Sequence, residues 1–180
     1  MSTSVILIRG INVGGKNPVK MAGLREVLED LGCSNVETLL VSGNAVVDGA
    51  PKDLATRLED ELPKRFHLHD EKVKVLVLSE NQVRAIVADK PAGFGESPDK
   101  YHSDALFYIG IPVDMSIFSP REGVDAVWPG KAVVYSQRLT AERTKSRLSK
   151  MMESPDYKSL TIRSWATTMK LIAMLDRRAE

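Results

Sequence analysis

The fold is decided by residues 5–32, which read VILIRGINVGGKNPVKMAGLREVLEDLG. Its first residues, Val5–Arg9, form a mostly apolar run that is too short for a helix and is typical of a strand. A glycine-rich loop follows, and beyond it apolar residues recur at the spacing of one helix face: Met21, Leu24, Val27, Leu28 and Leu31. Gly32 is a natural left-handed cap for the end of this helix. The stretch therefore predicts a strand, a loop and an amphipathic helix.

The elements after this helix complete a ferredoxin-like order. Two short apolar runs around a Ser-Gly pair predict a hairpin over Val36–Val41 and Asn44–Asp48. Leucines spaced four residues apart between positions 54 and 62 mark a second helix, and Val73–Leu78 is a continuous apolar strand. The resulting order, β-α-β-β-α-β, is that of the split ferredoxin-like unit. A helix over Glu80–Ala88 closes this half.

A similar order returns later in the chain. Residues 91–104 are rich in glycine and proline and predict a linker. Beyond it the pattern predicts a strand, a short helical stretch, a hairpin, a helix, a short strand and a last helix: Ala105–Ile109, Pro112–Phe118, Gly123–Val127 with Ala132–Tyr135, Arg143–Met152, Ser159–Ile162 and Trp165–Leu175. We therefore expect an α+β fold of two tandem ferredoxin-like halves with antiparallel sheets, residues 1–90 and 105–180, with a C-terminal helix.

The composition is that of an ordinary globular chain. Of 180 residues, 43% are hydrophobic and 27% are charged, which excludes a mostly disordered protein. The 25 basic and 24 acidic residues leave a net charge of +1, so a globally basic nucleic-acid binder is not expected. A single cysteine excludes an internal disulfide and a cysteine-based zinc cluster. The sequence shows no signal-peptide pattern and no membrane-spanning apolar run, so we expect a cytoplasmic protein without a membrane partner.

Two groups of motifs carry a resemblance to a known family. The first strand runs into RGINVGGKN at residues 9–17, and SGN follows at residues 42–44. Nearer the C-terminus stand TKSRL at residues 144–148 and RSW at residues 163–165, followed by Lys170-Leu171. Over essentially the whole chain this pattern resembles the domain of unknown function 1697 family, a widespread group of bacterial proteins. The resemblance supports the fold and directs attention to the motifs, but it implies no activity, substrate or cofactor.

The glycine loop is the first candidate site. Residues 10–16 match the first seven positions of a phosphate-binding loop, but Asn17 and Pro18 replace the magnesium-binding hydroxyl and the helix start, so a nucleoside-triphosphatase is not expected. A weaker anion site fits better, because glycines let backbone N–H groups converge near the start of a helix. From Arg9 to Arg25 there are four basic residues and no acidic one. The alternative is that the glycines only shape a tight turn.

The expected topology brings a second motif to this loop. In a ferredoxin-like sheet the third strand runs antiparallel beside the first, which places residues 42–44 next to Arg9 and Gly10. We therefore predict a set of ligand-binding residues at one edge of the sheet: Arg9, Asn12, Gly14, Gly15, Lys16, Asn17, Ser42, Gly43 and Asn44. The expected ligand is a phosphorylated or otherwise anionic small molecule, or a nucleic acid such as RNA.

The C-terminal third of the chain is basic. Residues 131–180 hold 11 basic and 5 acidic residues, and such a run can neutralise phosphates. Lys145, Arg163 and Trp165, whose ring could stack on a base or a sugar, therefore join the predicted ligand-binding set. The alternatives are a solvated helix face, or pairing with the acidic first half, and for Trp165 a half-buried helix anchor. Ser164 and Ala166 stand where the family usually has asparagines, so any ligand contact that those amides make in relatives is in doubt here.

No catalytic constellation accompanies these sites in the sequence. His67 and His69 alternate in a polar stretch without further ligands, Cys33 lies in no motif, and His102 stands alone in the predicted linker. We predict no metal site and no cofactor. Two alternatives to simple binding stay open: an enzyme that uses the loop as a clamp for a small anionic substrate, and a protein-interaction module that pairs through a sheet edge.

Overall fold

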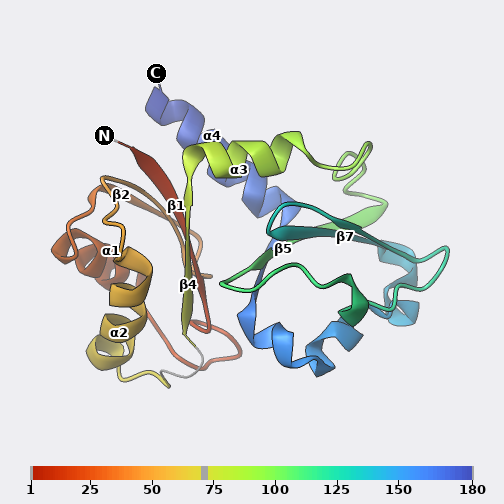
Figure 1. Ribbon diagram of the computed structural model, residues 1–180, viewed down its shortest axis with the longest axis horizontal. Coiled ribbons are helices and arrows are strands. Elements are labelled where there is room, and N and C mark those ends of the chain that lie inside the picture. Colours follow the sequence, from red (N-terminus) through yellow and green to blue (C-terminus); the bar gives the residue numbers. More distant parts are fainter. Residues whose placement is uncertain (1, 70–72, 180) are drawn as a thin grey trace. The chain divides into compact units, whose positions relative to one another are not determined.

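The computed structural model describes residues 2–69 and 73–179. The chain forms two compact units (Figure 1). The first unit comprises Met1–Arg84 together with Leu171–Glu180, and the second comprises Ala85–Lys170. Among the described helices, none combines the length and the apolar character needed to cross a membrane.

The first unit has the ferredoxin-like topology. Its elements follow the order strand, helix, two strands, helix, strand: β1 (Thr3–Arg9), α1 (Met21–Asp30), β2 (Ser34–Leu39), β3 (Asn44–Asp48), α2 (Leu54–Phe66) and β4 (Lys74–Ser79). The four strands pair antiparallel in the order β2-β3-β1-β4. Both helices lie on one face of this sheet (Figure 1). The expected β-α-β-β-α-β unit is therefore confirmed.

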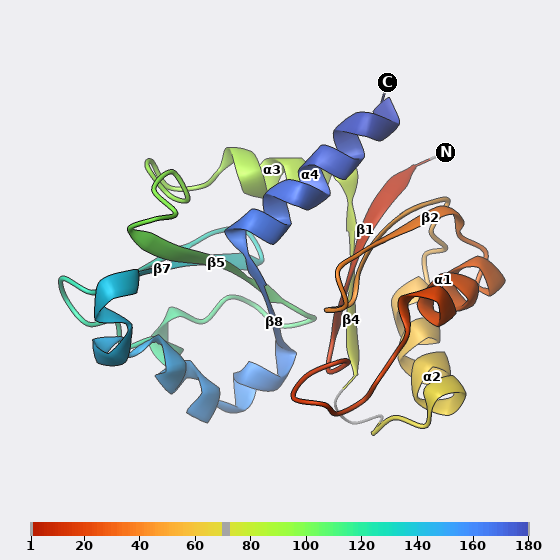
Figure 2. The same cartoon turned by 180° about the vertical axis from the view of Figure 1, so that it is seen from behind.

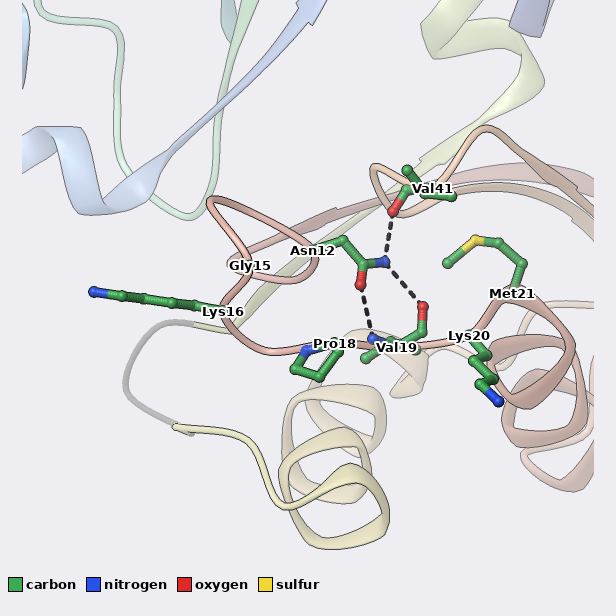
Figure 3. A pocket seen from close by; sticks show the side chains of 8 residues that line it. All are labelled: Asn12, Gly15, Lys16, Pro18, Val19, Lys20, Met21 and Val41. Atoms are coloured by element: carbon green, nitrogen blue, oxygen red, sulfur yellow. Dashed lines mark hydrogen bonds between the residues drawn. The ribbon is translucent and has the colours of Figure 1, made fainter.

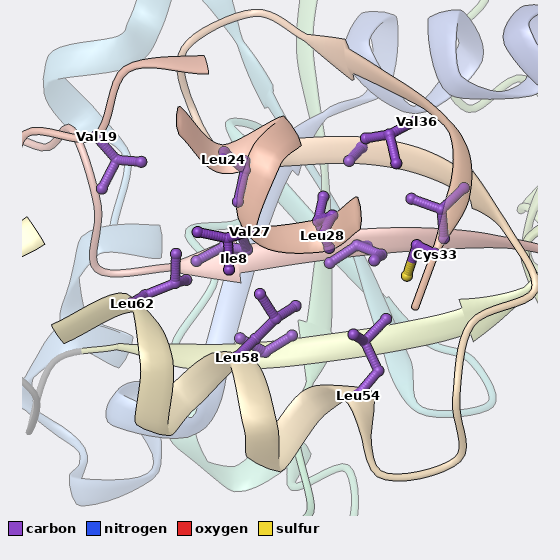
Figure 4. Close-up of a cluster of buried hydrophobic side chains, with 14 of the residues drawn as sticks. Ile8, Val19, Leu24, Val27, Leu28, Cys33, Val36, Leu54, Leu58 and Leu62 are labelled. Carbon is purple, nitrogen blue, oxygen red and sulfur yellow. The ribbon is translucent and has the colours of Figure 1, made fainter. Parts of the chain in front are cut away.

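The core of the first unit lies between the sheet and its two helices (Figure 4). Successive side chains of a strand point to opposite faces, so Ile6 and Ile8 of β1 both face the helices. Apolar residues at helical spacing on α1 and α2 close over them and are fully buried: Leu24, Val27, Leu28, Leu54, Leu58 and Leu62. This packing holds the β1–α1 loop at one end of the sheet.

The C-terminal segment is anchored to the first unit by Arg178, near the end of α4 (Trp165–Ala179). Its side chain is 8% exposed. The guanidinium donates to Glu37 Oε1 at 3.0 Å and to Asp48 Oδ1 at 3.3 Å, and also to the backbone carbonyls of Asn35 and Val46. The last residues therefore belong with β2 and β3. This differs from the expected second half, residues 105–180, because an order of elements along the chain does not show where a terminal helix docks.

The second unit repeats the strand order, but 3₁₀ helices stand in the connections where the first unit has α1 and α2. Its strands are β5 (Tyr101–Tyr108), β6 (Asp125–Pro129), β7 (Val133–Leu139) and β8 (Leu160–Ser164). They pair antiparallel in the order β6-β7-β5-β8, which matches the order of the first sheet position by position. Figure 2 labels three of these strands, β7, β5 and β8. The connections are short 3₁₀ helices: Met115–Ile117, Thr140–Lys145, Leu148–Glu153 and Pro155–Ser159. The α+β fold with two antiparallel four-stranded sheets and a C-terminal helix is confirmed.

Two details of the second unit differ from the sequence prediction. The helix expected over Arg143–Met152 is wrong, because this stretch is divided between two 3₁₀ elements, Thr140–Lys145 and Leu148–Glu153, and the backbone is extended at Ser146 between them. Only Leu148 and Met151 are buried there, so no apolar stripe supports a regular helix. The strand expected from Ala105 begins at Tyr101, inside the predicted linker 91–104, because its outer residues are polar. The α3 helix (Glu80–Ala88) forms as expected.

Candidate functional site

The glycine loop is a tight β-hairpin. The N–H of Lys16 donates to the carbonyl of Val13 at 3.0 Å, and Gly14 and Gly15 form the two-residue tip between them. Both glycines have positive φ, +57° and +74°, as a type I′ turn requires at its two central positions. This turn alone explains why two successive glycines stand here. Both are exposed, so the tip presents its backbone to solvent.

Asn12 ties this hairpin to the neighbouring loop. Its Nδ2 donates to the carbonyls of Val19 at 2.9 Å and Val41 at 2.6 Å, and its Oδ1 accepts from the N–H of Val19 at 2.8 Å (Figure 3). Its φ of +54° is one that asparagine tolerates better than most residues. The amide thus joins the segment before α1 to the turn between β2 and β3. Sequence reasoning assigned this side chain to a ligand, whereas here it holds two loops together.

Asn17 and Asn44 have similar structural roles. Asn17 is 5% exposed, donates to the carbonyl of Gly10 at 2.8 Å and accepts from the N–H of His69 at 3.1 Å. Asn44 is fully buried and donates to the carbonyl of Leu39 at 3.0 Å and to Ser42 Oγ at 2.9 Å. The asparagines of both motifs therefore cross-link three connections at one end of the sheet: β1–α1, β2–β3 and α2–β4.

Gly43 brings the SGN motif against β1, as the topology predicted. The N–H of Ile8 donates to the carbonyl of Gly43 at 2.8 Å, and Leu7 pairs with Asn44. A Cβ at residue 43 would lie 2.9 Å from Ile8 Cβ and 3.0 Å from the Ile8 carbonyl oxygen. Its φ is +78°, so only glycine fits both the conformation and the space.

A shallow, open hollow of about 400 Å³ lies beside the hairpin. Its lining combines aliphatic residues with two lysines and the Asn12 amide: Asn12, Gly15, Lys16, Pro18, Val19, Lys20, Met21 and Val41. The side chains of Lys16 and Lys20 extend away from Asn12 in different directions (Figure 3). Within the described part of the chain, neither ammonium has an ion-pair partner. The hollow is therefore apolar at its floor and positively charged at its rim.

The other predicted site residues are distributed over both units. Arg9 is the last residue of β1, partly buried, in register with Lys74. Lys145 is exposed and pairs with Glu142 at 2.6 Å. Arg163 is 7% exposed, and burial lowers its pKa to about 10. Its Nη1 donates to Thr161 Oγ1 at 2.9 Å. Lys145 and Arg163 belong to the second unit, whereas the glycine loop belongs to the first.

Trp165 is an anchor at the start of α4. It is 6% exposed, and its ring packs edge-on against Phe94 with centroids 5.0 Å apart. A Cβ at Gly95 would lie 2.2 Å from Trp165 Cδ1, so the chain passes directly over the indole. Ser164, at the position where the family usually has asparagine, accepts from the N–H of Thr167 at 3.2 Å and so caps the helix. The burial of Trp165 corresponds to the alternative interpretation of this residue, a helix anchor.

One polar pair was missed by sequence reasoning. His102 Nε2 lies 3.0–3.1 Å from the carboxylate oxygens of Asp104, on β5. Burial raises the pKa of Asp104 above its ordinary value, although His102 and Arg138 oppose the shift. The available signal was the spacing, because residues i and i+2 of a strand share a face. It was overlooked because β5 was expected to begin only at Ala105.

The comparisons with known proteins agree with this fold. A solved structure described as "The structure of conserved bacterial protein SP0830 from Streptococcus pneumoniae" is similar over 97% of this chain and 98% of its own, with 29% sequence identity and a TM-score of 0.76. No curated protein matches the chain. The sequence model of the family described as "Protein of unknown function (DUF1697)" matches residues 1–135, three quarters of the chain. The protein therefore belongs to the DUF1697 family.

Proposed function

We propose that the first unit binds a phosphorylated or otherwise anionic ligand, a nucleotide or RNA, at the glycine hairpin. The observation that carries this proposal is the hollow beside the hairpin, where an aliphatic floor meets a rim with Lys16 and Lys20. Between Arg9 and Arg25 no carboxylate opposes these charges within the segment itself. A ligand with an anionic group and an apolar body suits such a surface, and a nucleotide has both.

Three features supply the anion contacts in this proposal. Lys16 offers a charge-assisted hydrogen bond from an exposed side chain without an ion-pair partner in the described residues. The N–H groups of Gly14 and Gly15, at the hairpin tip, donate to no acceptor among the described residues and are exposed. Helix α1 begins at Met21 with no acidic residue in its first turn, so the partial positive charge of its N-terminus is not offset there.

The floor of the hollow favours a binder over an enzyme. Pro18, Val19, Met21 and Val41 can contact a base or sugar through apolar surface. Among the described residues that line the hollow, Lys16 and Lys20 are the ionisable ones, and the hollow is open to solvent. A general acid–base pair facing the ligand would be expected of the enzyme alternative. The asparagines of the motif position the loops, so their contribution to binding is indirect.

Lys16→Ala tests this proposal. Calorimetric titration with nucleoside phosphates and with a short RNA at low salt should show a ten- to hundredfold loss of affinity, since one charge-assisted hydrogen bond is worth about 1.5–3 kcal/mol. The free energy of unfolding should change by less than about 0.5 kcal/mol, because the side chain is exposed. Lys52→Ala removes an exposed lysine elsewhere in the same unit and should leave binding unchanged.

Gly14→Val separates the turn from the site. A β-branched residue at φ +57° strains the hairpin, so both stability and binding should fall, whereas Lys16→Ala should affect binding alone. If Lys16→Ala binds every tested anion as tightly as the parent protein, the proposal is wrong and the hairpin is only a turn. A parent protein that binds none of these ligands contradicts it equally.

A further inference from the structure

We propose a second anion subsite on the second unit, in which His102 of β5 and Arg138 of β7 together hold a phosphoryl group. The two residues pair directly across the antiparallel strands. They lie on the face of the sheet that carries the buried cluster of Leu106, Tyr108, Val134 and Leu160, beyond the edge of that cluster. The residues of this subsite belong to the second unit, whereas the glycine hairpin belongs to the first.

The strand register assembles a polar area at this end of the sheet. On β5, the core residues Leu106 and Tyr108 share their face with Asp104 and His102, because they are separated by even numbers of residues. The pairs across the sheet extend this face onto the neighbouring strands, where the polar residues next to the core are Ser136 and Arg138 on β7, Ser164 on β8 and Asp125 on β6. Apolar packing thus gives way to polar side chains along all four strands.

Asp104 acts as a positioning residue for His102. The side chain of Asp104 is 17% exposed, whereas that of His102 is 43% exposed. The carboxylate accepts from His102 Nε2 at 3.0–3.1 Å, which fixes the orientation of the ring. Since the His102 side chain is partly exposed, a ligand can reach its ring. With Nε2 donating to Asp104, Nδ1 is the nitrogen left for a ligand, and it donates to an anion when the ring carries both protons.

Arg138 supplies the second contact. In the described part of the structure its guanidinium forms no ion pair within 4 Å, although Asp104 and Asp125 are near enough for their charges to interact with it. Asp125 is itself held in place, because its Oδ2 accepts from the N–H groups of Arg121 at 2.9 Å and Arg147 at 2.8 Å. The two carboxylates therefore stabilise a positive charge here while the donors of the guanidinium stay available to a ligand.

The geometry favours a tetrahedral anion over a planar one. A guanidinium binds two oxygens in one plane, and a planar carboxylate is satisfied by that contact alone. Directly paired residues of antiparallel strands have Cβ atoms about 4.5–5.5 Å apart, so the imidazole approaches the same ligand from the adjacent strand. A phosphoryl group offers a third oxygen in that direction. We therefore assign the subsite to phosphate monoesters rather than to carboxylates.

The test is a titration of the full-length protein with inorganic phosphate, followed by NMR of the imidazole C–H signals. The chain has three histidines, and His102→Gln identifies the signal of His102. We expect a saturable shift of that signal and at least tenfold weaker binding in Arg138→Gln, with Arg138→Lys in between because lysine keeps the charge but loses the planar fork. Lys131→Gln removes the same charge from an exposed position two residues before the start of β7 and should match the parent.

Three outcomes would overturn the proposal. These are no saturable shift of His102 in the folded parent protein, equal weakening by Lys131→Gln and Arg138→Gln, and acetate binding as tight as phosphate. Should Arg138→Gln not fold, Arg138→Lys decides, because unchanged phosphate binding in that variant also contradicts the inference. Lys16→Ala should leave the His102 shift unchanged, so failure of this subsite is distinguishable from failure of the site at the hairpin.

Discussion

The two units share one strand order but are covered in different ways. The first sheet, β2-β3-β1-β4, is covered by two regular helices whose leucines are fully buried. One face of the second sheet, β6-β7-β5-β8, packs against 3₁₀ segments that contribute the buried residues Phe118 and Met151. Pairing of the strands therefore does not depend on regular helices in the connections. The sheet requires apolar side chains packed against its face, and short irregular turns can supply them.

The two units can also be compared at the turn that precedes the third strand of each, β3 in the first unit and β7 in the second. In the first, the N–H of Ile8 donates to the carbonyl of Gly43, and in the second, the N–H of Tyr108 donates to the carbonyl of Ala132. Both Gly43 and Ala132 have positive φ, +78° and +60°. The second unit tolerates an alanine at this position, whereas the first has no room for its Cβ. The tighter approach to β1 distinguishes the first unit from the second.

The largest expected effect comes from removing core volume. Leu58→Ala should lower the free energy of unfolding by about 3–5 kcal/mol, because Leu58 is fully buried between α2 and the sheet. Met151→Ala should cost less, about 2 kcal/mol, since a 3₁₀ turn can collapse into the space more easily. Urea unfolding followed by circular dichroism gives both values. An equal or larger loss in Met151→Ala would show that the irregular cover is packed as rigidly as the helices.

Exchanging the two turn residues sharpens the comparison further. Gly43→Ala should destabilise by about 2–4 kcal/mol, because it adds left-handed strain and a clash with Ile8. In Ala132→Gly, relief of strain is offset by the greater freedom of glycine in the unfolded chain, so the change should stay below about 1 kcal/mol. Urea unfolding of both variants measures the difference. Similar effects at both positions would remove the distinction drawn between the two turns.

A smaller effect concerns acid stability in the first unit. Burial raises the pKa of Asp48, but hydrogen bonds from Asn35 and Thr3 and the charge of Arg178 outweigh it, so the pKa lies below its ordinary value. A lowered pKa in the folded state means that the carboxylate stabilises the fold above about pH 4 and that this contribution is lost as pH falls further. Asp48→Asn should therefore destabilise by about 1–2 kcal/mol at pH 7 and have little effect near pH 2.

A matched control and a counterpart accompany this acid-stability prediction. Asp60→Asn removes an exposed carboxylate of α2 and should have little effect at either pH. Asp125 is the counterpart in the second unit: burial raises its pKa, but hydrogen bonds from Arg147, Ser146 and Arg121 outweigh it. Asp125→Asn should thus show the same pH dependence. Thermal unfolding from pH 2 to 7 tests all three, and a pH-independent loss in Asp48→Asn would contradict the assignment.

The smallest effect is expected at Tyr135, in the core of the second unit. Its hydroxyl donates to the carbonyl of Ile86 at 2.6 Å, so Tyr135→Phe should cost about 1 kcal/mol of stability. Burial, and then the charge of Asp89, raises its pKa to about 12. Because the folded pKa is raised, this residue stabilises the fold below about pH 10, and its contribution is lost as pH rises toward 12. Phenolate absorbance should show one tyrosine that titrates last in the parent protein. That titration step should be missing in Tyr135→Phe.

Local patterns predicted most of the secondary structure because each pattern has a local physical cause. The leucine spacings of α1 and α2 and the glycine turn before β3 follow from helix and turn geometry, and both are present. The unit topology followed from the order of these elements, so the contact of residues 42–44 with β1 could be predicted as well. The helix expected over Arg143–Met152 failed, because a few periodic residues without a continuous apolar face do not form a regular helix.

The roles of individual side chains were decided by the tertiary structure. The sequence placed Asn12, Asn17 and Asn44 in one region, but whether an amide faces a ligand or a neighbouring loop depends on which carbonyls lie within reach after folding. The position of His102 opposite Arg138 required the register of β5 against β7. Hydrogen bonds between residues far apart in the chain, and the burial of their side chains, depend on the packing of the whole sheet. They cannot be predicted from the local spacing of residues.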